Sequence, residues 1–150
     1  MRIAVDGVVI AEGQLLLILY HDQQRGLHYG LPGGGVEPNE TIRAAVRREL
    51  YEETGVQVDI GALLLVTEHR PADDPAQGGV GHELRLLFRC ALRSDAESGE
   101  PTVPDPDQIG ICWLPLDQVA TTAFAPHNGA LLLELLANPA AYDVFLATGF

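Results

Sequence analysis

Lysine is absent from the sequence: all nine basic residues are arginine, whereas 21 residues are aspartate or glutamate, and the formal net charge is −12. The missing lysine indicates a compositional bias rather than a functional device. Binding duplex DNA or an anionic membrane requires clustered basic side chains that contact phosphates. The acidic balance therefore argues against both partners, and an anionic substrate would need a metal ion in order to bind.

Cysteine is scarce as well, because only Cys90 and Cys112 occur, far apart and each in an apolar, strand-like context. Their number and spacing match no zinc site. We expect two buried thiols in a protein of a reducing compartment.

Long hydrophobic runs are also missing. Asp6 interrupts the first apolar run, and the run at residues 15–20 is too short to span a bilayer. The sequence therefore predicts no signal peptide and no membrane span, with a cytoplasmic location as the default. Hydrophobic residues make up 47% and charged residues 20% of the 150 residues, which is ordinary for a globular protein. We expect one domain over residues 1–150, without internal repeats or linkers.

Residues 34–56 carry the most distinctive pattern, GGVEPNETIRAAVRRELYEETGV. Within this segment, residues 41–54 predict one short helix that no proline interrupts. Asn39 or Thr41 can cap its start, and Gly55 provides its C-terminal stop.

One face of this predicted helix changes character along its length. At 100° per residue, Ile42, Ala45 and Val46 share an apolar side. The same side continues with three glutamates, Glu49, Glu52 and Glu53. These carboxylates repel one another, and the last two lie at the negative end of the helix dipole. A divalent cation would remove both penalties, and magnesium or manganese suits oxygen ligands and substrate phosphates. The alternative is a solvated acidic helix end paired with Arg47 and Arg48, but the face on which the acids lie favours the metal site.

The segment resembles the Nudix box, the 23-residue signature of the Nudix hydrolase (MutT-like) family. The signature is written G-x5-E-x7-R-E-U-x-E-E-x-G-U, where U is a bulky aliphatic residue. Every fixed position is met, by Gly34, Glu40, Arg48, Glu49, Leu50, Glu52, Glu53, Gly55 and Val56. The glycine-rich segment at residues 30–35, GLPGGG, also resembles the segment that usually precedes the box. Glycine there lets the backbone approach metal or phosphate closely.

The resemblance implies a role for each of these residues. In relatives, the metal ions are held by the glutamates that match Glu49, Glu52 and Glu53. The backbone carbonyl of Gly33 would join them, and Gly34 would lie against the substrate. Glu40 would pair with Arg48, which would orient the metal ligands without touching substrate. Arg48 could instead be a surface partner of Glu52, and both contacts can coexist.

Candidate residues also lie outside the box. The polar stretch at residues 21–29 is expected to be a loop, which the resemblance places beside the substrate cleft. Arg25 and His28 could contact phosphate or base there. The alternative is that both are ordinary loop residues. Arg70 follows the β-prone segment 58–68 and is a further candidate for substrate binding. The neighbouring His69, His82 and Glu83 are interpreted as polar strand ends.

An acid from a later loop is the last candidate. Several Nudix enzymes bring an additional acid from the loop before the late strand, as a metal ligand or as the general base. Asp107 is the candidate here and Asp105 the reserve, and a solvated acidic loop is an equally good interpretation.

The order of predicted elements indicates an α+β domain. Strands are expected at residues 3–10, 14–20, 58–68, 83–92 and 109–114, loops at 71–81 and 94–107, and helical segments at 41–54, 115–119, 126–137 and 139–147. The turn Ala11-Glu12-Gly13 predicts a hairpin between the first two strands. The resemblance implies the Nudix α/β/α sandwich, a mixed sheet between helices.

The implied activity is hydrolysis of a phosphoanhydride in a nucleoside diphosphate linked to another group, with Mg²⁺ or Mn²⁺ as cofactor and a small nucleotide as substrate. A (d)NTP pyrophosphohydrolase is favoured by the compact length, with ADP-ribose or nucleotide-sugar pyrophosphatase as the alternative. Two other classes stay open: a Nudix module that binds a nucleotide without cleaving it, and a structural metal-binding domain. A homodimer is common in the family.

Overall fold

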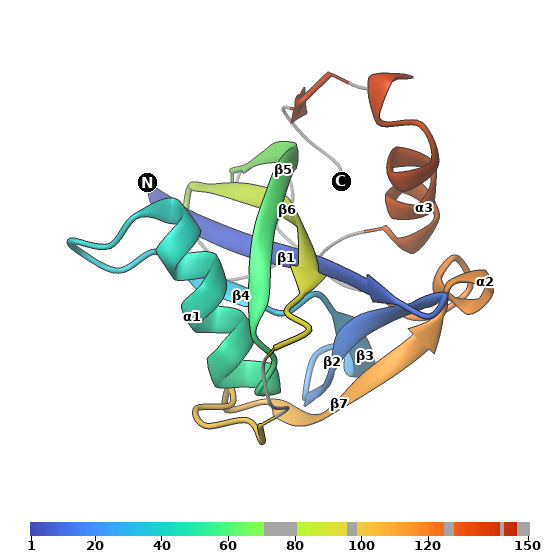
Figure 1. The fold of residues 1–150 in the computed structure, drawn as a ribbon, viewed down its shortest axis with the longest axis horizontal. Helices are drawn as coiled ribbons and strands as arrows, with labels where there is room; N and C mark the ends of the chain where they lie inside the picture. The colour runs from blue at the N-terminus through green and yellow to red at the C-terminus, as the bar shows by residue number, and fades with distance from the viewer. Residues whose placement is uncertain (71–80, 96–98, 125–127, 142, 147–150) are drawn as a thin grey trace.

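The computed structural model describes residues 1–70, 81–95, 99–124, 128–141 and 143–146 (Figure 1). Its strands are β1 (Arg2–Ala11), β2 (Gln14–Asp22), β3 (Gly26–Gly30), β4 (Gly33–Gly35), β5 (Val58–His69), β6 (Glu83–Leu92), β7 (Gln108–Pro115) and β8 (Phe145–Leu146). Its helices are α1 (Ile42–Thr54), α2 (Leu116–Val119), α3 (Gly129–Ala137) and a short 3-10 turn at Pro139–Ala141. The described strands form one sheet in the order β3-β2-β1-β6-β5-β8, with β4 added to β1 and β7 to β2.

The first two strands form the predicted hairpin and then diverge. Glu12 and Gly13 both have positive φ, 51° and 75°, as a tight two-residue hairpin turn requires. The strands pair only next to this turn, where Ile10 lies opposite Leu15. Farther on, β1 pairs in parallel with β6 and antiparallel with β4, whereas β2 pairs with β3 and β7. The sheet is therefore mixed, as expected, and it opens between β1 and β2.

Two hydrophobic cores lie on the two faces of this sheet. Val5 and Val9 of β1 belong to the core that contains Ala45, Val46 and Leu50 of α1. Val8, between them on the strand, points the other way into the core that contains Leu132 and Leu135 of α3. Alternate residues of one strand thus contact helices on opposite sides, and α1 and α3 flank the sheet in Figure 1. The predicted α/β/α sandwich is confirmed.

Helix α1 has the predicted boundaries. The side chain of Thr41 accepts a hydrogen bond from the N–H of Ala44 at 3.2 Å, so Thr41 rather than Asn39 is the cap. Gly55 ends the helix with φ 70° and donates its N–H to the carbonyl of Tyr51. Glu53 is buried beside the apolar stripe, at 1% exposure. The apolar face of α1 therefore continues into a buried glutamate, as the sequence predicted.

Residues 21–29 are not wholly a loop, which corrects the prediction. The side chain of Asp22 accepts hydrogen bonds from the N–H groups of Gln24 and Arg25, Gly26 has φ 67°, and β3 then pairs with β2. An aspartate turn followed by a left-handed glycine is a hairpin signal. The strand forms because pairing with β2 outweighs the polar composition of the segment.

The C-terminal part also differs from the prediction. Helix α3 starts after Asn128, whose side chain accepts from the N–H of Leu131 at 3.1 Å. Beyond Ala137 a short 3-10 turn and the strand β8 occur where helix was expected, because β8 pairs in parallel with β5. Residues 126–127 and residues 142 and 147 of the expected helical segments lie outside the described residues, as do residues 71–80 and 96–98 of the expected loops.

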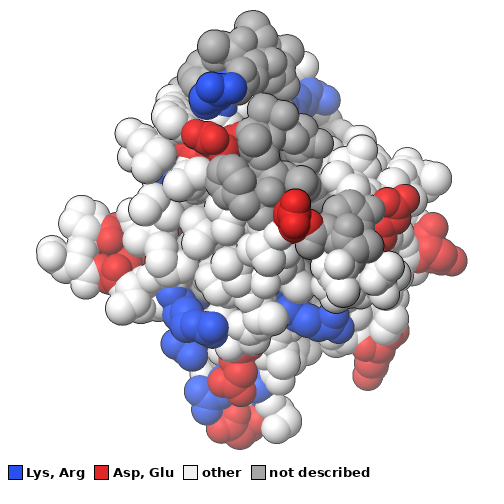
Figure 2. Space-filling model, turned by 90° about the horizontal axis from the view of Figure 1, so that it is seen from above, with Lys and Arg blue, Asp and Glu red and all other residues white. Residues whose placement is uncertain are grey.

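Other expectations concern the surface and the thiols. Cys90 is buried, Cys112 is partly buried, and both are free thiols. On the face drawn in Figure 2, arginines alternate with acidic side chains and form no continuous basic surface. Among the described residues, no helix has the length and apolarity needed to cross a bilayer.

Candidate active site

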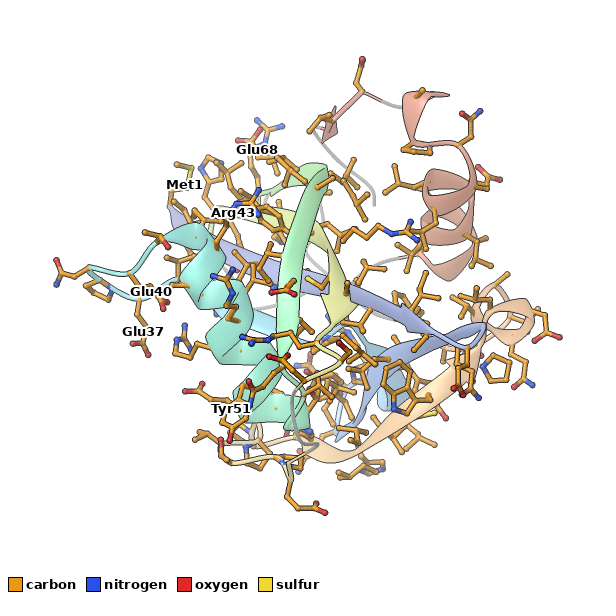
Figure 3. The ribbon with its side chains drawn as sticks, in the orientation of Figure 1. Met1, Glu37, Glu40, Arg43, Tyr51 and Glu68 are labelled. Carbon is orange, nitrogen blue, oxygen red and sulfur yellow. The ribbon has the colours of Figure 1, made fainter. Side chains whose placement is uncertain are left out.

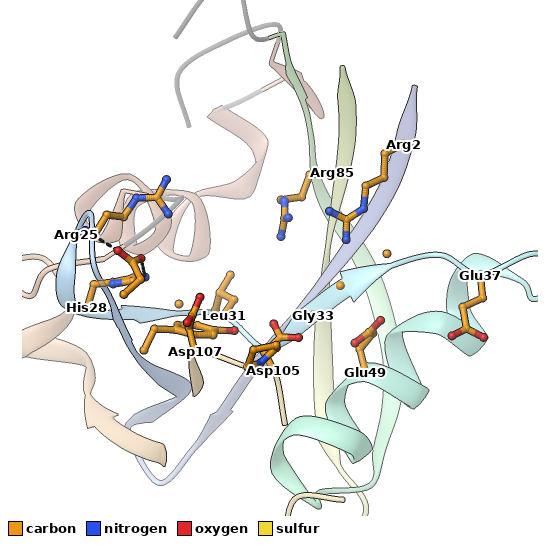
Figure 4. Close-up of a pocket in the computed structure, with 16 residues that line it drawn as sticks. Arg2, Arg25, His28, Leu31, Gly33, Glu37, Glu49, Arg85, Asp105 and Asp107 are labelled. Carbon is orange, nitrogen blue, oxygen red and sulfur yellow. Dashed lines mark hydrogen bonds and ion pairs between the residues drawn. The ribbon is translucent and has the colours of Figure 1, made fainter. Parts of the chain in front are cut away.

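A cleft of about 600 Å³ lies beside the short strand β4 (Figure 4). Its lining comes from β1, β2, β3, β4, β6, α1 and the loop before β7, and includes Arg2, Tyr20, Asp22, Arg25, His28, Gly33, Gly34, Gly35, Glu37, Glu49, Arg85, Asp105 and Asp107. These elements converge because β1 and β2 diverge after their hairpin. The cleft therefore sits where the sheet opens, with α1 on one side.

Strand β4 consists of three glycines, of which Gly34 and Gly35 make room for charged side chains and Gly33 makes room mainly for the backbone of β1. A Cβ at Gly34 would lie 2.6 Å from the carboxylate of Glu49. A Cβ at Gly35 would lie 3.0 Å from the guanidinium of Arg2, and one at Gly33 would overlap the backbone carbonyl of Val5 and then the carboxylate of Asp6. Successive residues of a strand face opposite sides. Figure 4 accordingly shows Glu49 on one side of β4 and Arg2 on the other.

The carboxyl group of Glu53 is held at the edge of β4. Its Oε2 accepts a hydrogen bond of 2.8 Å from the N–H of Gly33. Its Oε1 is buried and has no hydrogen-bond partner among the described residues. The pKa of Glu53 is raised to about 9, chiefly by burial and also by the nearby carboxylates of Asp105 and Glu49, against the lowering effect of the Gly33 hydrogen bond.

Arg48 connects the other acidic residues of the box. It donates to Glu40 at 2.7 and 3.2 Å and to the carbonyl of Gly35 at 3.0 Å. Its Nη1 also donates to Glu49 at 2.8 Å and to Glu52 at 3.2 Å. Both contacts considered from the sequence, to Glu40 and to Glu52, therefore coexist. Figure 3 places Glu37 and Glu40 in the loop that leads into α1.

These contacts act on the ionisation of the glutamates. The hydrogen bond from Arg48 lowers the pKa of Glu40. Burial raises the pKa of Glu49, and the charges of Glu52 and Asp105 act in the same direction, whereas Arg48 opposes the shift. Glu49 lines the cleft, but Glu52 lies outside it, against Arg48.

The loop before β7 is fastened to the end of α1. The side chain of Gln108 donates to the carbonyl of Glu53 at 2.8 Å, and the N–H groups of Thr102 and Val103 donate to the carbonyl of Glu52. Asp105 and Asp107 consequently both line the cleft. The charge of Asp105 raises the pKa of Glu53 and Glu49, which places this reserve candidate next to the box glutamates. Asp107 lies on the side toward Leu31 in Figure 4.

The other end of the cleft is built by β2 and β3. The rings of Tyr20 and His28 stack, with centroids 5.4 Å apart and an interplanar angle of 19°. Burial raises the pKa of Tyr20. Arg25 lines this end, as the sequence suggested, and its N–H donates to the side chain of Asp22 at 2.5 Å. An aromatic pair beside an arginine can receive a flat heterocycle and a phosphate.

Four residues differ from the sequence-based expectations. Arg2 and Arg85, which were not singled out, line the cleft. Glu83, interpreted as a polar strand end, is buried at 4% exposure and ion-paired with both arginines. Arg70 is exposed after the end of β5 and is not among the described residues that line the cleft.

The donor set fits a hard divalent cation after a local rearrangement. Within the described parts of the chain, no three histidine, cysteine, aspartate or glutamate side chains already converge in a way that would hold an ion, because Arg48 contacts Glu49 and Glu52. Among the described residues, Oε1 of Glu53 is nevertheless buried without a hydrogen-bond partner, and the charges of Asp105 and Glu49 act on this carboxyl group. The N–H and C=O of one strand residue point to the same edge, so the Gly33 carbonyl also faces away from β1. Carboxylate and carbonyl oxygens suit magnesium or manganese.

Comparison with known proteins gives concordant matches. The NUDIX domain model matches residues 1–135. An ADP-ribose pyrophosphatase of Methanocaldococcus jannaschii is 37% identical over 86 residues, 57% of this chain and 48% of that protein. A MutT-like protein of Streptomyces ambofaciens is 33% identical over 119 residues, 79% of this chain and 66% of that protein. The chain thus spans about half the length of the first relative and about two thirds of the length of the second. The MutT NUDIX hydrolase of Burkholderia pseudomallei has a similar structure, with TM-score 0.63, 30% identity and coverage of 90% of this chain and 95% of that one.

Proposed function

The chain belongs to the NUDIX domain family, and from this premise we propose that it hydrolyses a phosphoanhydride bond in a nucleoside diphosphate linked to another group. One observation carries the proposal. The buried Glu53, with an unpartnered oxygen, and the cleft-facing Glu49 flank the glycine strand β4. Such an arrangement serves to bring a cation and a phosphate against the backbone, whereas a structural metal site would be closed.

Proteins of this family generally use divalent metal ions, and we propose Mg²⁺ or Mn²⁺ for this chain. Glu49, Glu52 and Glu53 would hold the ion together with the carbonyl of Gly33. Once bound, it would neutralise the diphosphate, lower the pKa of a coordinated water and stabilise charge on the leaving oxygens.

The chain's own residues prepare this site in three ways. Arg48 keeps the carboxylates of Glu49 and Glu52 close together and ties them to Glu40, so that only a local rearrangement is needed to bring them to an ion. The N–H of Gly33 orients the carboxyl of Glu53. Asp105, next to the box glutamates, or Asp107 provides a further acid in the cleft, suited to accept a proton from the attacking water.

The substrate class is proposed as a (d)NTP, cleaved to a nucleoside monophosphate and pyrophosphate. The positively charged residues among the described lining, Arg2, Arg25 and Arg85, support a substrate with several phosphates. The alternative is ADP-ribose or a nucleotide sugar, which the ADP-ribose pyrophosphatase among the relatives favours.

The test is product analysis with Mg²⁺ or Mn²⁺: release of pyrophosphate and a nucleoside monophosphate from dNTPs, and release of a nucleoside monophosphate and a sugar phosphate from ADP-ribose and nucleotide sugars. A Glu52→Gln protein serves as the control for contaminating hydrolases. Selective turnover that the variant loses supports the proposal and names the substrate class. If no compound is hydrolysed while nucleotides still raise the melting temperature, the chain is a nucleotide-binding module instead.

A further inference from the structure

Four charged side chains form an ion-pair cluster at one wall of the cleft. Arg85 of β6 contacts Asp6 of β1 through Nη1 at 2.6 Å. It also contacts Oε1 of Glu83 through Nε and Nη2, both at 3.0 Å. Arg2 reaches Oε2 of Glu83 at 3.3 Å. The parallel pairing of β1 with β6 sets Arg2 opposite Glu83 and thereby assembles the cluster.

Stability alone does not account for this cluster. The side chains of Asp6 and Glu83 are 1% and 5% exposed, and burying two carboxylates is costly even when they are paired. An apolar pair of similar volume would often stabilise the sheet as well or better. The arrangement is better explained by what it does to Arg85, whose guanidinium is fixed from two sides at the wall of a cleft.

The contacts within the cluster do not use all the N–H donors of its two arginines, both of which line the cleft. A guanidinium has five N–H donors, and the contacts that Arg85 makes among the described residues use three nitrogens. Arg2 is half exposed, at 52%, and its guanidinium lies over Gly35, where a Cβ would approach its Nη2 to 3.0 Å. Both arginines line the cleft on the side of β4 opposite to Glu49 (Figure 4).

We propose that Arg2 and Arg85 bind the phosphoryl group farthest from the nucleoside, and so select nucleoside triphosphates over nucleoside diphosphates that end in a sugar. This inference rests on the proposed function for the position of the diphosphate. The stacked pair of Tyr20 and His28 receives the base at one end of the cleft. The diphosphate then lies along β4, and the terminal group reaches the arginines. A guanidinium recognises a phosphoryl group by paired, charge-assisted hydrogen bonds that a neutral sugar cannot accept as strongly.

The charge of the cleft supports this assignment. The other lining side chains near β4, Glu37, Glu49 and Asp105, are acidic, and Arg25 lies at the far end with the aromatic pair. A terminal phosphoryl group has therefore no other cation on this side of β4 among the described residues. Asp6 and Glu83 are already neutralised by the arginines, so they add little repulsion.

The experiment measures binding, which does not require turnover. Calorimetry with Mg²⁺ compares a methylene-bridged nucleoside triphosphate analogue with the corresponding diphosphate analogue. The variants are Arg2→Gln, at an exposed position that should fold normally, and Arg85→Lys, which keeps a charge for Asp6 and Glu83. Arg89→Gln is the matched control, because Arg89 lies exposed on the same strand and does not line the cleft.

We expect the preference of the wild-type protein for the triphosphate to fall about tenfold in Arg2→Gln and in Arg85→Lys, and to stay unchanged in Arg89→Gln. Equal preferences in the Arg2 and Arg89 variants, or no binding of either analogue to the wild type, would overturn the inference. Failure of the proposed function gives a different result, namely analogue binding without hydrolysis of any substrate. Conversely, hydrolysis of nucleotide sugars in preference to triphosphates would retain the enzyme and refute the selection by Arg2 and Arg85.

Discussion

The N–H of Gly33 donates a hydrogen bond of 2.8 Å to Oε2 of Glu53, which lies 20 residues later in the chain. This bond joins the edge of a β-strand to the last turn of the helix that packs beside it. The second carboxyl oxygen is buried and has no hydrogen-bond partner within the described part of the chain. The protonation state of Glu53 is therefore linked both to the stability of the fold and to the binding of a cation.

Stability of the metal-free protein should decrease as the pH rises. Burial raises the pKa of Glu53 from 4.5 to about 9, so the folded state retains a proton that the unfolded state has released. The contribution is complete below pH 4.5 and is lost as the pH passes 9, with a slope of at most about 1.4 kcal/mol per pH unit. Urea denaturation with a chelator from pH 5 to 9 measures it. Glu53→Gln should lack this component, and parallel curves for the two proteins would contradict the assignment.

Binding of a divalent cation should strengthen with pH over the same range. A metal ligand must be deprotonated, so binding at Glu53 releases a proton. Titration of Mn²⁺ at pH 6, 7 and 8 should show rising affinity in the wild type. We expect Glu53→Gln to bind at least about tenfold more weakly, with most turnover lost and with a weaker pH dependence, since the raised pKa of Glu49 remains. A variant that keeps the wild-type affinity would show that the ion binds elsewhere.

Arg48→Ala should weaken metal binding by about 10- to 100-fold, the effect typical of residues that orient metal ligands. Arg48 holds Glu49 and Glu52 in place and joins them to Glu40. Arg47→Ala is the control, because Arg47 is the exposed neighbour on the other side of the helix. The two variants are compared by Mn²⁺ titration and by kcat. Unchanged metal dependence in Arg48→Ala would rule out the orienting role.

Gly34→Ala should lower metal affinity and turnover about tenfold while changing the free energy of unfolding by less than about 1 kcal/mol. The new methyl group would meet the carboxylate of Glu49 at 2.6 Å, and the end of that side chain can move. Gly110→Ala is the control, since no atom lies within 4 Å of its added Cβ. Identical activities in the two variants would mean that the position of Glu49 is unimportant.

The two loop acids should differ in their effects. Asp105→Asn should reduce kcat by about 100-fold, the range for loss of a general base, because the charge of Asp105 acts on both Glu49 and Glu53. Asp107→Asn should reduce kcat by less than about tenfold. The pH profiles of kcat distinguish a base from a residue that only binds substrate. The reverse order of effects would favour Asp107, which the loop sequence alone suggested first.

The contacts within the Nudix box could be predicted because they join residues that are close together in the sequence. The pair of Glu40 and Arg48 lies within one helix and its preceding loop, and the bond between Gly33 and Glu53 spans 20 residues. The helical period and the cap at Thr41 were sufficient to place the glutamates on a buried face. The ligand set itself remains a proposal.

The opposite wall of the cleft could not be predicted in this way. Arg85 meets Asp6 across 79 residues, through a parallel pairing that no local pattern encodes. In sequence, Asp6 only interrupts an apolar run and Glu83 only begins a strand. The strand β3 was missed for a related reason, since residues 21–29 take their structure from pairing with β2.

The parallel pairing of β1 with β6 also has a consequence for synthesis. The first strand acquires this neighbour only when the segment that runs from Glu83 to Cys90 has left the ribosome. Until then, helix α1 has been translated without the complete surface against which it packs, and its apolar side stays exposed. Non-local strand pairing slows folding and prolongs such exposure. The apolar side of α1 thus becomes fully covered only after more than half of the chain has been translated.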